Sequence, residues 1–161
     1  MRLRLVIAAA LATALSVAGI GSAIGAKRPT FAGALFANAT GKKEISATTG
    51  KKNAGDLNGR AGFTAVIDGT QLCWAIVAKD VDGTPSGAHI HKGTANVNGP
   101  IVVPFDAPTN IDPGTSSGCE TISATLAAAI VKNPSKYYFN LHSTPAFPGG
   151  AVRGQLSWRR N

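Results

Sequence analysis

An alternating pattern of apolar residues in positions 60–76 constrains the fold more than any other feature of the sequence. Apolar side chains occupy every second position on both sides of the dipeptide Asp68-Gly69. This period of two predicts extended strands, because successive side chains of a strand point to opposite faces. An Asp-Gly pair favours the tight turn that joins two antiparallel strands. The segment therefore predicts a β-hairpin with one buried face, formed by Phe63, Ala65, Ile67, Leu72, Trp74 and Ile76.

Short apolar runs separated by Gly, Pro, Asn and Asp continue through the rest of the chain. One helix, capped by Ser123 or Thr125, is expected to end at Asn133-Pro134. The segment before Cys119, rich in Pro, Asp, Gly and Ser, is expected to be a loop. Many short strands with one helix favour an antiparallel sandwich or barrel over alternating β-α-β units. We therefore expect an all-β fold, whose other strands lie at residues 31–37, 88–91, 101–105, 137–142 and 151–157.

The first 26 residues have the pattern of a secretory signal peptide. Arg2 and Arg4 form a basic start, an apolar stretch follows, and Ala26 offers the small residue that signal peptidase accepts. We expect cleavage after Ala26; cleavage after Ala23 and retention as an uncleaved anchor are the alternatives. The protein is then secreted or held in the periplasm or cell envelope, with no stable membrane span after cleavage.

The chain that remains has 161 − 26 = 135 residues, a length that buries one hydrophobic core. We expect residues 27–58 to form a first strand and a flexible Gly/Lys-rich segment, and residues 59–158 to form the β-sandwich core. Two of the 16 basic residues leave with the signal, so the net charge falls from +8 to +6. The basic pairs have no interleaved aromatic residues, which argues against nucleic acid. They are expected to be solvated surface, with attraction to anionic glycans, envelope polymers or lipid headgroups as the alternative.

The only two cysteines are Cys73 and Cys119. An even count in an exported chain favours one disulfide, and the absence of a Cys-x-x-Cys spacing argues against a metal-thiolate site. The bridge would close a loop of 119 − 73 = 46 residues. A loop of this length is expected to add about 4 kcal/mol of stability.

All three histidines lie in two short segments of predicted strand. His89 and His91 are two residues apart and therefore project from the same face, and His142 lies on the polar face of a later strand. Three neutral imidazoles with an open coordination position suit copper or zinc. The alternative is structural: each imidazole donates to a carbonyl and accepts from a hydroxyl or amide, without any ion.

The polar face of the last predicted strand carries Arg153 and Gln155, and Asn140 lies on the corresponding face of the strand before it. These residues are candidates either for binding an anion or for a structural role. The structural role is favoured, because the donors of an arginine commonly tie loop carbonyls or an aspartate together. Asp80 and Asp82 are the expected partners. No residue is assigned a catalytic role.

Several motifs together resemble the CHRD (chordin-type) domain family, in its single-domain exported bacterial form. The resemblance covers residues 59–156 and is looser over residues 31–58, where Glu44-Ile45 stands in place of a Glu-Val pair. It implies an immunoglobulin-like or superoxide-dismutase-like β-sandwich, and it implies no settled activity. The segments that carry it are Gly87-Ala88-His89-Ile90-His91-Lys92-Gly93, Asn98-Gly99-Pro100, residues 133–143 and residues 147–156.

We expect a secreted or envelope-associated binding or structural module whose histidine face binds a divalent metal or fixes a recognition surface. Its partner would be a protein or an envelope polymer. The alternative is a small copper or zinc metalloenzyme of oxidoreductase type, in which Arg153 guides an anionic substrate. A copper/zinc superoxide dismutase would need more ligands than three histidines, and growth-factor binding of the chordin type is disfavoured by the few aromatic residues.

Overall fold

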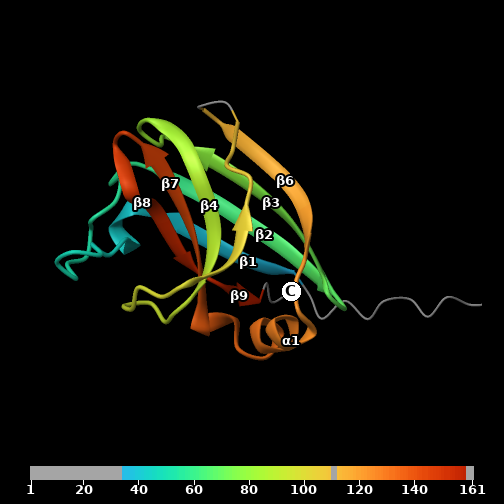
Figure 1. Ribbon diagram of the computed structural model, residues 1–161. Helices are drawn as coiled ribbons and strands as arrows, with labels where there is room; N and C mark the ends of the chain where they lie inside the picture. Colours follow the sequence, from blue (N-terminus) through green and yellow to red (C-terminus); the bar gives the residue numbers. More distant parts are fainter. Residues whose placement is uncertain (1–33, 110–111, 159–161) are drawn as a thin grey trace, which may run out of the picture.

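The computed structural model describes residues 34–109 and 112–158 of the chain (Figure 1). The expected signal peptide and the first residues of the expected strand 31–37 lie outside the described residues. No helix within the described part of the chain is long and apolar enough to cross a membrane.

One antiparallel sheet contains all the strands of the described residues. The strand order across it is β5-β4-β7-β8-β1-β2-β3-β6, and the short β9 pairs with β1. The strands are β1 (Leu35–Thr40), β2 (Arg60–Asp68), β3 (Gln71–Lys79), β4 (Thr84–Lys92), β5 (Ile101–Phe105), β6 (Gly114–Thr121), β7 (Tyr137–Thr144), β8 (Phe147–Gln155) and β9 (Ser157–Trp158).

The sheet curls so that its two halves face each other across one hydrophobic core (Figure 1). Aromatic contacts show this closure: Phe63 of β2 stacks on Phe105 of β5 and on Phe139 of β7, at ring-centroid distances of 5.4 and 4.8 Å. Trp74 of β3 lies 4.8 Å from Phe105. The burial of these rings removes a large apolar area from water and holds the two halves together.

Helix α1 (Ala124–Lys132) begins where the sequence predicts. The Ser123 hydroxyl caps it by accepting a hydrogen bond from the Leu126 N–H at 3.2 Å. Ala127 and Ile130 face the core, and Asn133 ends the helix before a single 3₁₀ turn, η2 (Pro134–Lys136). A second 3₁₀ turn, η1 (Gly41–Lys43), follows β1.

The expected all-β fold with one short helix is confirmed, as is the hairpin of β2 and β3. The expected loop before Cys119 is wrong, because this segment forms strand β6, paired with β3 from Gly114 to Thr121. Strand β6 lies at the edge of the sheet and consists mostly of Gly, Ser and Thr. Neither of its faces carries an apolar row, so the sequence pattern contains no signal for it.

Further strand boundaries differ from the sequence expectation. Strand β4 begins at Thr84, inside the turn expected over residues 82–85. Strand β1 begins at Leu35 and continues to Thr40, beyond the expected end at residue 37. Strand β8 begins at Phe147, which reduces the expected turn between β7 and β8 to Pro145-Ala146. Strands β1 and β8 extend through polar or glycine-rich positions, where pairing with the neighbouring strand decides the boundary.

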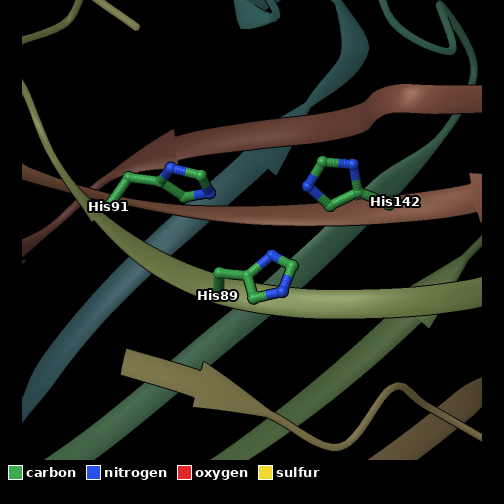
Figure 2. Close-up of side chains that lie close together, drawn as sticks. All are labelled: His89, His91 and His142. Atoms are coloured by element: carbon green, nitrogen blue, oxygen red, sulfur yellow. The ribbon is translucent and has the colours of Figure 1, made fainter. Parts of the chain in front are cut away.

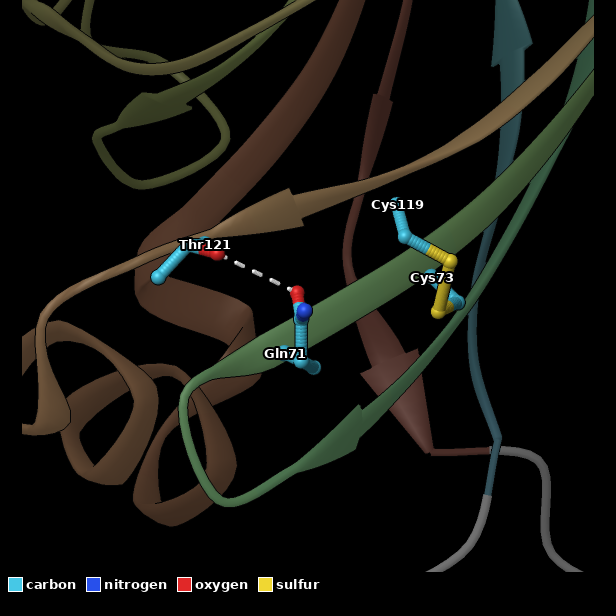
Figure 3. The surroundings of a disulfide bond; sticks show 4 residues. All are labelled: Gln71, Cys73, Cys119 and Thr121. Atoms are coloured by element: carbon cyan, nitrogen blue, oxygen red, sulfur yellow. Dashed lines mark hydrogen bonds between the residues drawn. A yellow bond between two sulfur atoms is a disulfide. The ribbon is translucent and has the colours of Figure 1, made fainter.

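A disulfide joins Cys73 of β3 to Cys119 of β6 (Figure 3). The two residues are direct partners in the ladder, with their Cα atoms 4.0 Å apart. Beside them the Thr121 hydroxyl donates to the Gln71 side-chain oxygen at 3.4 Å. The expected bridge is therefore confirmed, and it fastens the edge strand β6 to the sheet.

We predict that Cys73→Ala/Cys119→Ala lowers the free energy of unfolding by about 4 kcal/mol, because the unbridged chain regains the entropy of its 46-residue loop. Urea titration of the oxidised protein and the variant measures this difference. Dithiothreitol should destabilise the parent protein and leave the variant unchanged. Equal stability of both proteins under oxidising conditions would contradict the prediction.

Candidate metal centre

The three histidines meet on the outer face of strands β4 and β7. Within the ladder, His89 lies opposite Asn140, and His142 lies opposite Gly87. The side chains of Ala88 and Ile90, between and beside the histidines on β4, are fully buried in the core. The expected alternation is therefore confirmed: the core takes one face of β4 and leaves the imidazoles on the other.

Figure 2 shows the three rings turned toward one space, with His89 and His91 coming from β4 and His142 from β7. One nitrogen from each ring lies within 4.8 Å of the corresponding nitrogen of the other two. Histidine nitrogens that share a tetrahedral zinc ion at 2.0–2.1 Å are about 3.3–3.4 Å apart. Metal binding would thus require the ring nitrogens to approach each other by up to about 1.5 Å.

Backbone carbonyls fix the orientation of two of the rings. The Nδ1 atom of His91 lies 2.9 Å from the Gly99 carbonyl oxygen, and that of His142 lies 3.0 Å from the Pro148 carbonyl oxygen. A carbonyl oxygen can only accept, so each Nδ1 carries the proton and each Nε2 presents a lone pair. This arrangement is typical of metal-binding histidines, whose second nitrogen donates to a carbonyl or carboxylate.

Three of the other four ring nitrogens are buried without a hydrogen-bond partner among the described residues. These atoms are Nδ1 of His89 and Nε2 of His91 and His142, and all three are buried. The structural alternative requires each imidazole to donate and also to accept. The described residues supply no hydrogen-bond partner for these three nitrogens. A buried polar atom without a partner lowers the stability of the folded state. A metal ion shared by the three lone pairs would remove this cost.

His89 and His91 are held in the neutral form that a metal requires. Burial is the main cause that lowers the pKa of His89 to about 4, and repulsion from a positive charge on His142 or His91 adds to it. Burial also lowers the pKa of His91, against the raising effect of its hydrogen bond to Gly99. Near pH 7 no proton competes with a metal for these two imidazoles.

A stack of three side chains continues from the histidines into the neighbouring loop. The Tyr138 ring lies parallel to the His91 ring at a centroid distance of 4.7 Å and an interplanar angle of 7°. On Tyr138 lies the Arg153 guanidinium, with its Cζ atom 3.5 Å from the ring centroid. Such a cation over an aromatic face is attracted by the ring quadrupole.

Arg153 ties the loop of residues 93–100 to the sheet. Its Nη1 donates to the Asn98 side-chain oxygen at 2.8 Å, and its Nη2 donates to the Thr94 and Val97 carbonyls at 2.9 and 2.8 Å. The expected structural role of Arg153 has this geometric support. The expected partners Asp80 and Asp82 are wrong, because the guanidinium donates to Asn98, Thr94 and Val97 and to neither aspartate.

Asn140 and Gln155 also fasten chain segments around the cluster. The buried Asn140 amide donates to the Glu44 carboxylate and, at 3.2 Å, to the Val152 carbonyl. The Gln155 amide nitrogen lies 2.7 Å from the Gly93 and Ser135 carbonyl oxygens. Each of these two side chains bridges loops and strands.

Glu44 and Tyr138 support the site, although sequence reasoning assigned them no role there. Glu44 is 4% exposed, and burial raises the pKa of its carboxyl against the lowering effects of the hydrogen bond from the Ile45 N–H, of Arg153 and of His142. Gly150 makes room for this carboxyl, because a Cβ at its φ of +130° would lie 2.6 Å from the Glu44 Oε2. Two sequence features could have indicated these roles: the Glu44-Ile45 motif, and the position of Tyr138 on the same strand face as His142.

We predict that metal-free protein loses stability as the pH falls from 6.5 toward 4. The unfolded chain takes up a proton on His89 near its ordinary pKa, whereas the folded chain takes it up only near pH 4. Stability therefore rises with pH across this window. Urea titrations in chelator at several pH values measure the slope, and His89→Phe should flatten it. A pH-independent difference between the two proteins would contradict the assignment.

We also predict that Arg153→Lys lowers the free energy of unfolding by about 1–3 kcal/mol, because one ammonium cannot replace the planar fork that binds three loop oxygens. Thermal or urea unfolding at fixed pH measures the loss. The exposed Lys92→Arg on β4 serves as the matched control and should change stability by about 0.5 kcal/mol or less. A loss no larger than that of the control would be the contrary result.

The comparison with protein families agrees with this arrangement. The family model of the CHRD domain matches residues 35–156, from the first residue of β1 to the residue after β8, and this range includes every residue of the histidine cluster. No curated protein and no solved structure is significantly similar to the chain. Because the family model covers well over half of the 161 residues, the chain belongs to the CHRD domain family.

Proposed function

We propose that this CHRD domain is an exported metal-binding module that holds one copper or zinc ion through His89, His91 and His142. The observation that carries the proposal is the set of three buried, unpartnered imidazole nitrogens that face one another within 4.8 Å. Imidazole nitrogen suits both metals, and neutral rings bind without first releasing a proton.

Two features support export from the cytoplasm. The basic and apolar pattern of residues 1–26 is that of a signal peptide, which we propose is removed after Ala26. The Cys73–Cys119 disulfide fits an oxidising compartment. The protein would then be secreted or kept in the periplasm or cell envelope, where it would encounter a protein or an envelope polymer as its partner.

A small copper or zinc metalloenzyme is the second candidate function. Catalytic zinc sites commonly have three protein ligands and one position for water or substrate, and the histidine cluster supplies three. His89 and His142 are only partly buried, so a small molecule in solvent can reach the fourth position. The chemistry there would be that of a metal-bound water or substrate, and Arg153 lies too deep in the loop network to contact it directly.

We predict about one copper or zinc per chain in protein purified from the envelope or medium without a histidine tag or chelator. Elemental analysis measures the content. His89→Ala/His91→Ala should lose the metal while the circular dichroism spectrum is retained, because the rings lie outside the hydrophobic core. Gln71→Ala, an exposed change on β3, is the matched control and should keep the metal.

Uptake of added copper or zinc by the chelated parent, measured by calorimetry, tests the same site independently of expression conditions. Binding that is saturable at one ion per chain and absent in the double variant agrees with the proposal. A folded parent protein that contains no metal and takes up none would refute it and would leave the three histidines a structural role. Only a metal-loaded protein justifies assays for the enzymatic alternative.

A further inference from the structure

A cavity of about 440 Å³ lies beside β1, η1 and the loop of residues 93–100, and its lining includes no histidine. Its size falls within the range that holds small-molecule ligands. The residues that form it come from distant parts of the chain, namely β1, the η1 turn, Lys52, the 93–100 loop, β8 and β9. The fold therefore assembles this cavity, and no local motif marks it.

The lining of the cavity is strongly basic. Lys42, Lys43 and Lys52 stand around it, Arg153 forms part of its wall, and none of the ten lining residues carries a carboxylate. The Lys43 ammonium donates to the Asn38 carbonyl at 2.6 Å, which holds this charge against β1. Like charges gathered in a concave surface focus a positive potential that attracts anions.

Arg153 adds a buried cation to this wall. Its side chain is 1% exposed, and its recorded hydrogen bonds within the described residues go to neutral oxygens of Thr94, Val97 and Asn98. A guanidinium has five N–H donors, and these three bonds leave the Nε–H and one Nη1–H. The nearby Glu44 carboxyl, which interacts with Arg153 but forms no hydrogen bond with it, offsets part of this charge. An anion in the cavity would still meet a guanidinium that is already desolvated and fixed and that has free donors.

The remaining lining suits the neutral part of a polar ligand. Asn38 and Asn96 present amide groups, which can donate to and accept from hydroxyls. Phe36 is partly buried and offers an apolar surface at the same cavity. Amides beside an aromatic ring are the combination that binds the hydroxyl groups and the C–H face of a sugar.

We infer that this cavity binds a sugar that carries one anionic group, of the class of uronates and sugar phosphates. The lysines and Arg153 take the anionic group, the asparagine amides take the hydroxyls, and Phe36 packs on the ring. This site is separate from the proposed metal centre and does not depend on it. Its ligand chemistry is that of acidic polysaccharides outside the cell membrane.

The test is a titration of the ¹⁵N-labelled protein, purified as it is exported, with glucuronate, glucose 6-phosphate, glucose and inorganic phosphate. We expect saturable shifts at the cavity residues with glucuronate or glucose 6-phosphate, and affinities at least about tenfold higher than for glucose. Lys42→Gln/Lys52→Gln should weaken the better ligand by about tenfold. The metal content of this variant should equal that of the parent, which separates this site from the histidine cluster.

Lys79→Gln/Lys132→Gln is the matched control, because it removes the same charge from exposed positions that do not line the cavity. It should weaken binding by less than about twofold. Equal weakening by the two double variants would show general electrostatic attraction and overturn the inference. Equal affinity for glucose, for inorganic phosphate and for the charged sugars, or the absence of saturable shifts, would also overturn it. A preference between glucuronate and glucose 6-phosphate identifies which anionic group the cavity takes.

Discussion

The buried guanidinium of Arg153 is the interaction on which the polar side of the molecule depends. It binds the 93–100 loop through three oxygens and stacks on Tyr138, which in turn lies parallel to His91. The loop held in this way supplies the Gly99 carbonyl that orients His91. The loop thus orients the His91 imidazole through a hydrogen bond to Nδ1, the nitrogen that would not bind the metal. Metal-binding histidines are commonly oriented in this way.

The same loop separates two sites of different chemistry. On one side the three histidines present neutral lone pairs, which suit a soft or borderline cation. On the other side lysines surround a cavity without a carboxylate, which suits an anion. Arg153 contributes to both sites: its guanidinium lies over the Tyr138 ring beside the histidines, and its side chain lines the cavity. A change at this residue is therefore expected to disturb both sites.

Much of the fold follows from strand periodicity, but some of it does not. The alternation in residues 60–76 correctly predicts the β2–β3 hairpin, and Ser123, one of the two expected caps, caps the start of α1. Parity along β4 and β7 also correctly places the three histidines on one face. Strand β6 was missed because an edge strand of Gly, Ser and Thr has no apolar row, and only its pairing with β3 defines it.

The sequence by itself determined which side chains share a face, because a strand alternates whatever surrounds it. It also determined that two cysteines were available for one disulfide. Tertiary structure decided which faces meet. It placed Asn98, not Asp80 or Asp82, within reach of Arg153, buried Glu44 against Asn140, and gathered lysines from separate segments around one cavity. The physical reason is that these contacts depend on how the sheet curls, and the curl results from packing between strands distant in the chain.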